Sequence, residues 1–263
     1  MRAVSRITSR QHPVVRRCRQ LASKRRDGDP VLLDGEHLIV DALEARVPIE
    51  LVCTYDADAP VARRAAASGA TIHAVSESVM AAASPVRSPS GWLALAAWRP
   101  ATLGAVLGAS NRAGAGPVIA LHDVQDPGNL GAAIRSADGL GASGCLALDR
   151  TARPDGWKAI RGAMGSTFRL PIAVAPLTTA LERARARRLA VFATVAAGGL
   201  PIEDADLASP CMVLLGNEGA GLPDVEDATR VTIPMASGVE SINVAVAAAL
   251  ILYEARRQRK DRP

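Results

Sequence analysis

The sequence has few cysteines, and none of them is spaced for a structural role. Its 263 residues include Cys18, Cys53, Cys145 and Cys211, with no C-x-x-C pair and no histidine at a matching interval. This scatter argues against both a disulfide framework and a zinc site, and it is typical of proteins from a reducing compartment. We therefore expect a cytoplasmic protein that holds no metal.

Long apolar runs are missing as well. The longest, residues 244–252, is rich in alanine and much shorter than the roughly 20 residues of a membrane-spanning helix. The sequence thus predicts no transmembrane segment and no membrane partner. Hydrophobic residues nevertheless make up 49% of the chain and charged residues 22%, which excludes a disordered polymer and leaves room for two compact domains.

Acidic residues are absent from the first 26 positions, which contain nine Arg or Lys. Val14, Cys18 and Leu21 recur there at helical spacing, so we predict a basic amphipathic helix. Its arginines could neutralise the backbone phosphates of a nucleic acid, and the candidates are Arg10, Arg16, Arg17 and Arg19. A solvated helix face and an organelle-targeting peptide are the alternatives, and the direct lead into a folded pattern at Val31 disfavours the second.

The basic character of the whole chain is a weaker signal. The net charge is +5 and the pI about 9.4, but only Lys24, Lys158 and Lys260 are lysines. An excess of arginine over lysine, combined with abundant alanine, is the bias in residue usage that the base composition of a genome produces. It weakens any argument that arginine was selected for its bidentate phosphate geometry.

The first part of the chain alternates apolar runs with helical patterns. Runs at 31–33, 49–54, 71–75 and 92–97 predict strands, and 36–45, 60–67 and 76–83 predict helices. This alternation indicates a small α/β domain, which we assign to residues 1–105. Glycine and proline between 99 and 117 predict a flexible linker, assigned to residues 106–116.

The second part, residues 117–263, repeats strand and helix more strictly. Strands are predicted at 118–121, 145–148, 170–174, 191–195, 212–215 and 231–233, with helices ending at 140, starting at 157, and spanning 178–188 and 241–259. This order predicts an α/β fold with a mainly parallel six-stranded sheet and helices on both faces. The G-x-G-x-x-G pattern at 139–144 lies after a helix and before a strand, so it is interpreted as a turn and not as a dinucleotide site.

Three glycine-rich segments follow predicted strands in this second part. They are DPGNLGAAIR at 126–135, LGNEGAGLP at 215–223 and IPMASGVESINV at 233–244. Loops after the strands of open α/β sheets are where ligand-binding residues gather. In the first segment Asn129 could cap the helix that follows, and Arg135 could either face a pocket or pair with Asp138 on the surface. In the second, the glycines would let the backbone approach a ligand closely. Ser241 in the third could be a helix N-cap.

In this order the three segments resemble the sequence motifs of the SpoU (TrmH-like) class of knotted RNA ribose 2′-O-methyltransferases, the SPOUT superfamily, over roughly residues 117–258. The resemblance implies a trefoil knot, S-adenosyl-L-methionine (AdoMet) as cofactor, and a homodimer formed through the C-terminal domain. It implies catalytic roles for Asn129, Arg135, Glu218, Ser241 and Asn243. It implies cofactor contacts from Thr194, Gly216, Asn217, Gly219, Ile233, Met235 and Ile242.

Two positions depart from the family pattern. Ile242 stands where leucine is commoner, a volume-conserving change that should preserve the pocket. Ala163 stands where relatives often carry serine, which puts one secondary contact in doubt. The first domain resembles the L30e-like substrate-binding domains fused to ribosomal RNA members of the class, which favours 23S ribosomal RNA as substrate. The alternatives are a transfer RNA substrate, a noncatalytic RNA-binding or ribosome-assembly protein of the same fold, and base N-methylation.

Overall fold

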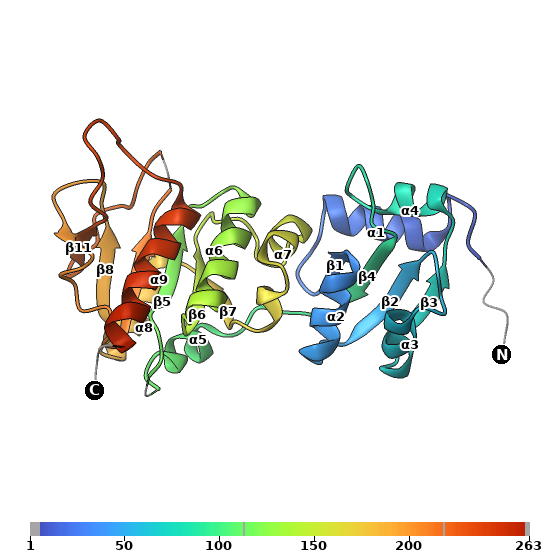
Figure 1. Cartoon of the computed structure of the whole chain (residues 1–263), viewed down its shortest axis with the longest axis horizontal. Coiled ribbons are helices and arrows are strands. Elements are labelled where there is room, and N and C mark those ends of the chain that lie inside the picture. The colour runs from blue at the N-terminus through green and yellow to red at the C-terminus, as the bar shows by residue number, and fades with distance from the viewer. Residues whose placement is uncertain (1–5, 113, 218, 261–263) are drawn as a thin grey trace. The chain divides into compact units, whose positions relative to one another are not determined.

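A computed structural model of the chain describes residues 6–112, 114–217 and 219–260. These residues form two compact units (Figure 1). Unit 1 comprises Met1–Arg99 together with Asp155–Phe168, and unit 2 comprises Pro100–Pro154 and Arg169–Pro263. Both are α/β structures, as the sequence predicts.

Unit 1 has a four-stranded sheet in the order β1-β4-β2-β3. β4 (Trp92–Ala96) runs antiparallel to both β1 (Val31–Asp34) and β2 (Ile49–Thr54), and β2 pairs in parallel with β3 (Thr71–Ala74). Alternate strand residues point to opposite faces, so the sheet has a core on each side. α1 (Pro13–Ser23) and α4 (Glu77–Ala83) pack on one core; α2 (Glu36–Glu44) and α3 (Pro60–Ala67) pack on the other (Figure 1).

The segment Asp155–Phe168 belongs to unit 1, although it lies between two strands of unit 2 in sequence. It contains α7 (Trp157–Ala163) and a short 3₁₀ turn, η1 (Ser166–Phe168). Ile160 of α7 is fully buried in the core with α2 and α3, and α7 packs against β1. The sequence assigns this segment to the second domain, because the strand–helix alternation there gives no sign of which core the helix joins.

Unit 2 is built on a seven-stranded sheet in the order β7-β6-β5-β10-β8-β11-β9, in which every pairing is parallel. Its strands are β5 (Val118–His122), β6 (Gly144–Leu148), β7 (Ile172–Ala175), β8 (Ala190–Thr194), β9 (Leu200–Pro201), β10 (Cys211–Leu215) and β11 (Thr229–Thr232). The parallel sheet confirms the predicted architecture, but the predicted number of six strands is wrong. The two-residue β9 is too short to produce an apolar run.

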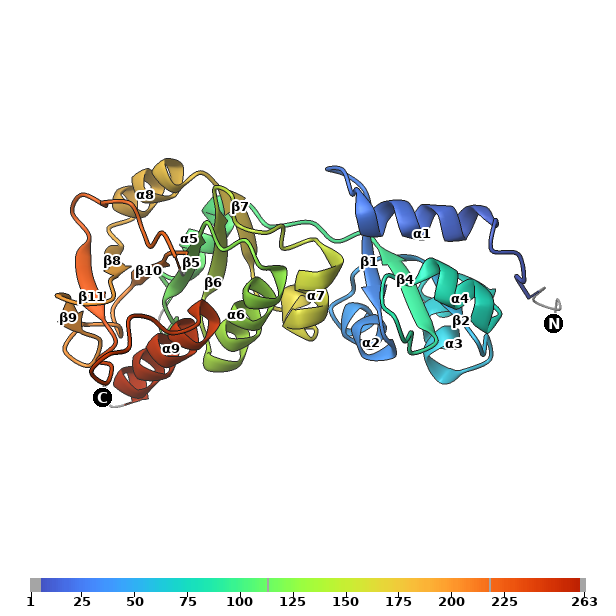
Figure 2. The same ribbon diagram turned by 90° about the horizontal axis from the view of Figure 1, so that it is seen from above.

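Helices cover both faces of this sheet (Figure 2). α5 (Leu103–Ala109) and α8 (Leu177–Ala186) share one core. α6 (Pro127–Leu140) and α9 (Val244–Lys260) pack side by side on the opposite face. α5 falls in the stretch that the sequence assigns to a flexible linker. It forms because the Thr102 side chain caps it and because Val106 and Leu107 are fully buried.

The turn at residues 139–144 behaves as its sequence context indicates. α6 ends at Leu140, Gly141 adopts the left-handed conformation with φ of 79°, and β6 starts at Gly144. A helix that ends in a left-handed glycine is an ordinary connection to a strand. The G-x-G-x-x-G pattern here is a helix-to-strand turn.

Candidate active site

A cavity of about 380 Å³ lies in unit 2, at the end of the sheet where its strands terminate. Its walls come from the segments that follow β8, β10 and β11 and from the start of α9. The carboxyl ends of neighbouring parallel strands meet at one edge of a sheet, which is why segments far apart in sequence converge here. The volume is in the range of small-molecule sites.

The loop after β10 is folded tightly upon itself. The Gly221 amide donates to the Asn217 carbonyl oxygen over 2.9 Å, and Gly221 has a φ of 68°. A Cβ on Gly216 would lie 2.4 Å from the Gly221 carbonyl carbon, so no side chain fits at Gly216. The sequence interpretation attributes these glycines to close approach of a ligand; in the structure Gly216 is required by the loop's own closure.

The chemistry of the walls suits a nucleoside with a polar tail. Leu215, Ile233, Ile242 and Val244 offer apolar surface, and the loop after β10 offers backbone polar groups. Glu240 is the one charged side chain among the described residues that line the cavity. The site therefore combines an apolar slot with a negative rim, which fits a ligand that carries both an aromatic ring and positive charge.

All seven residues that the sequence assigns to cofactor contact line this cavity, namely Thr194, Gly216, Asn217, Gly219, Ile233, Met235 and Ile242. The candidate Ser241 lines it too. Gly221, one of the glycines that the sequence suggests for close approach of a ligand, lines it as well, whereas sequence reasoning did not single out Val195, Ala196, Leu215, Ala220, Glu240, Val244 and Ala247. Most of these lie within or next to the three motifs, so proximity in sequence was an available signal; Ala247 lies one helical turn beyond the third motif.

A hydrogen bond joins the first motif to the third. The Asn243 amide nitrogen Nδ2 donates to Asn129 Oδ1 over 3.0 Å, across 114 positions of sequence. The sequence suggests that Asn129 caps α6, but the structure does not agree. The cap is Asp126, whose carboxylate accepts a hydrogen bond from the Asn129 backbone amide at 2.9 Å. Asn243, and not Ser241, precedes α9 and accepts from the Ala245 backbone amide at 2.9 Å.

Arg135 lies on α6 with an exposed side chain. Arg135 does not form the surface ion pair with Asp138 that the sequence offers as an alternative; Asp138 accepts a hydrogen bond from Arg169 Nε at 2.9 Å. Arg135 does not line the cavity itself. The fifth catalytic candidate, Glu218, lies outside the described residues.

The four arginines proposed for RNA contact lie on or just before α1 in unit 1 and are exposed. Val15, Cys18 and Leu21 form the buried side of that helix. Arg17 forms an ion pair with Glu50 at 2.5 Å, which offsets part of its charge. Arg10 and Arg19 line a surface cavity of about 490 Å³ beside the end of α4.

The thiols are buried and poorly suited to nucleophilic chemistry. Burial raises the pKa of Cys18 to about 11 and those of Cys53, Cys145 and Cys211 to about 12, and only a thiolate is an effective nucleophile. Over the described positions, no group of three or more His, Cys, Asp or Glu side chains could hold a metal ion. Across the same positions, no helix has the length and apolarity needed to cross a bilayer.

The fold and the cavity define a class: a parallel α/β domain with a small-molecule cavity at the carboxyl edge of its sheet, joined to a smaller α/β domain. The model of the SpoU rRNA Methylase family matches residues 116–253, and that of the MRM3-like substrate binding domain matches residues 12–94. The chain belongs to the SpoU rRNA methylase family.

Individual relatives agree with this placement. An uncharacterized tRNA/rRNA methyltransferase of Synechocystis is 34% identical over 97% of this chain and 94% of its own length. The 23S rRNA (guanosine(2553)-2′-O)-methyltransferase RlmP of Bacillus subtilis is 28% identical over 86% of this chain and 88% of its own. The crystal structure of AdoMet-bound rRNA methyltransferase from Sinorhizobium meliloti superposes with a TM-score of 0.85 at 31% identity, covering 96% and 97% of the two chains.

Proposed function

We propose that the protein is an AdoMet-dependent RNA ribose 2′-O-methyltransferase that acts on 23S ribosomal RNA. The observation that carries this proposal is the convergence of the three motifs. Two of them wall the cavity, and the Asn129–Asn243 hydrogen bond ties the first to the third. RlmP, which aligns with most of the chain, is a 23S ribosomal RNA 2′-O-methyltransferase by name.

The cavity residues divide into two roles toward AdoMet. Ile233 and Ile242 supply apolar surface for the adenine, and the backbone of residues 216, 217 and 219–221 supplies polar groups for the rest of the molecule. When bound, AdoMet supplies an electrophilic methyl group on a positively charged sulfur. The acidic rim at Glu240 complements that charge.

Catalysis in this proposal depends chiefly on positioning. A ribose 2′-hydroxyl is a weak acid and must lie in line with the methyl group to react, so holding it there provides much of the rate gain. Arg135 is too basic to remove the proton, since a guanidinium stays protonated. We assign it instead to orienting the ribose and its phosphate and to offsetting the negative charge that would develop on the oxygen as the hydroxyl proton leaves to solvent. Ser241, which lines the cavity, and Asn243, which contacts Asn129, are assigned as polar groups near the reacting oxygen.

Unit 1 is proposed to bind the RNA. It contains the region that matches a substrate-binding domain model, and α1 presents exposed arginines at positions 16 and 19. Phosphate contacts of this kind confer affinity that is independent of sequence and sensitive to salt. Base-specific selection of the target nucleotide would come from other contacts. We propose a cytoplasmic location, which agrees with a ribosomal RNA substrate.

The trefoil knot is part of the proposal. β10 lies between β5 and β8 in the sheet, although both precede it in sequence. A strand inserted between two earlier neighbours is compatible with a threaded chain, one of the rare exceptions to unknotted folds.

The test is to incubate the purified protein with methyl-labelled AdoMet and total RNA, and then to digest the RNA to nucleosides. The expected product is a 2′-O-methylnucleoside from 23S ribosomal RNA. A labelled transfer RNA or a methylated base would support the corresponding alternative instead. Absence of label in every fraction, with AdoMet bound, would point to a noncatalytic RNA-binding protein.

We also propose a homodimer formed through unit 2. Val246, Leu250 and Tyr253 on α9 are 50%, 42% and 64% exposed, and their spacing places them on one face of the helix. An apolar stripe of this kind opposite a buried face suits a second copy of the same helix. Light scattering should show a dimer that Leu250→Glu converts to monomer, whereas Val174→Glu, at an equally exposed apolar site on β7, should leave it intact.

A further inference from the structure

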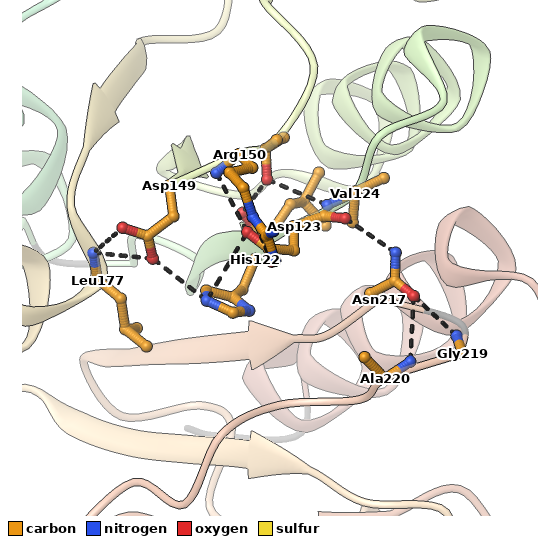
Figure 3. Close-up of polar contacts among 11 residues, drawn as sticks. His122, Asp123, Val124, Asp149, Arg150, Leu177, Asn217, Gly219 and Ala220 are labelled. Carbon is orange, nitrogen blue, oxygen red and sulfur yellow. Dashed lines mark hydrogen bonds and ion pairs between the residues drawn. The ribbon is translucent and has the colours of Figure 1, made fainter.

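A polar network beside the cavity is not explained by the roles assigned so far. It starts at Asn217, whose side-chain nitrogen and oxygen both form hydrogen bonds within the protein (Figure 3). Nδ2 donates to the Asp123 carbonyl oxygen at 2.9 Å, and Oδ1 accepts from the amides of Gly219 and Ala220 at 2.8 and 3.1 Å. Asn217 therefore shapes the loop after β10 and attaches it to the residue that follows β5.

Asp123 is fixed on both sides. Its φ of 56° is left-handed, a conformation that aspartate tolerates better than most residues. Its carboxylate is gripped by Arg150: Oδ2 accepts from Nε at 3.1 Å and from Nη2 at 2.5 Å, while Oδ1 accepts from the Arg150 backbone amide at 3.1 Å (Figure 3). The Asp123 side chain is only 13% exposed, whereas that of Arg150 is 78% exposed.

Neighbouring contacts hold together the segment after β5, which contains Asp123, and the segment after β6, which contains Arg150. The Thr151 hydroxyl donates to the Leu121 carbonyl at 2.9 Å and accepts from the Val124 amide at 3.2 Å. His122 Nε2 lies 3.2 Å from Asp149 Oδ2. The segments after β5 and β6 are thus joined at several points, and the hydrogen bond from Asn217 to the Asp123 carbonyl attaches the loop after β10 to them.

The position of Asp123 in the chain links this network to catalysis. Three residues further on, Asp126 caps α6, and α6 carries Asn129 and Arg135. On the other side, Asn217 leads into the loop that walls the cavity. A charge-assisted pair with two donors from one guanidinium sets direction as well as distance, so it can define how the first motif and the cofactor loop are aligned.

We infer that Asp123 and Arg150 form a positioning pair that aligns the cofactor loop with the loop leading to α6. This inference rests on the proposed function for its consequence in methyl transfer, but its first consequence is for AdoMet binding. Without the pair, the Asp123 backbone loses one of its restraints, so its carbonyl is held less firmly toward Asn217 and the Asn217 contacts to the amides of Gly219 and Ala220 are less well fixed. Neither Asp123 nor Arg150 needs to touch the cofactor.

The experiment is calorimetric titration of AdoMet into wild-type protein and into Arg150→Gln, Arg150→Lys and Asp123→Asn variants. Arg150→Gln and Asp123→Asn should raise the AdoMet Kd by roughly three- to tenfold, with one site per chain still filled. Arg150→Lys keeps the charge but loses the fork, so it should recover part of the affinity. The matched control is Asp138→Asn, which removes the exposed Arg169 pair of unit 2 and should leave Kd unchanged.

A purely structural role gives a different pattern. Partial unfolding lowers the number of sites filled and leaves Kd as it was, and that result would overturn the inference. So would wild-type Kd in both Arg150→Gln and Asp123→Asn. Because this titration contains no RNA, a wild-type protein that binds AdoMet but fails to methylate RNA would refute the proposed function without touching the pair.

Discussion

At the scale of single residues, Arg135 has the largest proposed role in catalysis. Replacing it by alanine should leave AdoMet binding intact, because Arg135 does not line the cavity. The rate at saturating RNA and AdoMet should fall roughly 100- to 1,000-fold, the usual loss when one group that stabilises developing charge is removed. Single-turnover methylation measures this directly. A full rate in Arg135→Ala would show that the ribose is oriented by other groups.

Glu240 should distinguish the cofactor from its product. AdoMet carries a sulfonium charge that S-adenosylhomocysteine lacks, and Glu240 is the charged side chain at the described cavity wall. Glu240→Gln should weaken AdoMet binding by roughly two- to fivefold at low salt and by less at high salt, as expected for an exposed charge. The affinity for S-adenosylhomocysteine should not change. Equal losses for the two ligands would mean that Glu240 acts through the shape of the loop.

Asp123 should also make stability depend on pH. The hydrogen bonds that the Arg150 side chain donates hold the pKa of the Asp123 carboxyl below its ordinary value, and the Arg150 backbone amide and the nearby His122 contribute in the same direction. Asp149 is the other acidic side chain that faces this cluster. A lowered folded-state pKa stabilises the native state above the unfolded pKa of about 3.9, and this contribution is lost as pH falls through the folded value. At pH 7 the urea concentration at the midpoint of unfolding should be higher for the wild type than for Asp123→Asn, and this difference should become smaller below about pH 4. A constant gap from pH 7 to pH 3 would contradict the assignment.

At the scale of elements, the loop after β10 depends on one glycine. Gly216→Ala places a methyl group 2.4 Å from the Gly221 carbonyl carbon, so the loop must open and AdoMet affinity should fall roughly tenfold or more. The control is Gly139→Ala on α6, where a Cβ meets nothing within 4 Å and alanine favours the helix by about 1 kcal/mol. Calorimetry and thermal unfolding on both variants check the expectation. Normal AdoMet binding by Gly216→Ala would show that the loop can open without cost to the site.

The sequence predicted most elements because their apolar runs are local. The ranges of β2 and α3 match the prediction residue for residue, and all seven proposed cofactor residues gather at one cavity because their motifs follow parallel strands. α5 was missed since its glycines obscured the two buried residues that fix it. The partner of Asn129 could not be predicted, because Asn243 lies 114 positions away and only the folded sheet brings them together.

At the scale of the whole molecule, the two units are not successive segments of chain. The polypeptide crosses from unit 1 to unit 2 after Arg99, returns at Asp155 and leaves again after Phe168. A single linker between two independent domains, as the composition of residues 99–117 suggests, would require one crossing. Unit 1 therefore cannot complete its core from residues 1–99 alone, since Ile160 is part of that core.

The returning segment is anchored by a buried ion pair, and this yields a prediction about how unit 1 folds. Arg25 Nη1 contacts Asp155 Oδ2, and the two side chains are 7% and 5% exposed. Removing one partner of such a pair leaves a buried charge and typically costs about 3–5 kcal/mol. Asp155→Ala should thus unfold unit 1 at markedly lower temperature, weaken RNA binding, and leave AdoMet binding by unit 2 close to normal.

The half-exposed Arg17–Glu50 pair in the same unit provides the comparison. Glu50→Ala should cost less than about 1 kcal/mol, because water already solvates both groups. Hydrogen exchange should show protection lost in β1 and α7 of Asp155→Ala and retained in Glu50→Ala, since α7 packs against β1. Equal effects of the two substitutions would mean that apolar contacts hold the segment 155–168 in unit 1, and that the ion pair adds little to its attachment there.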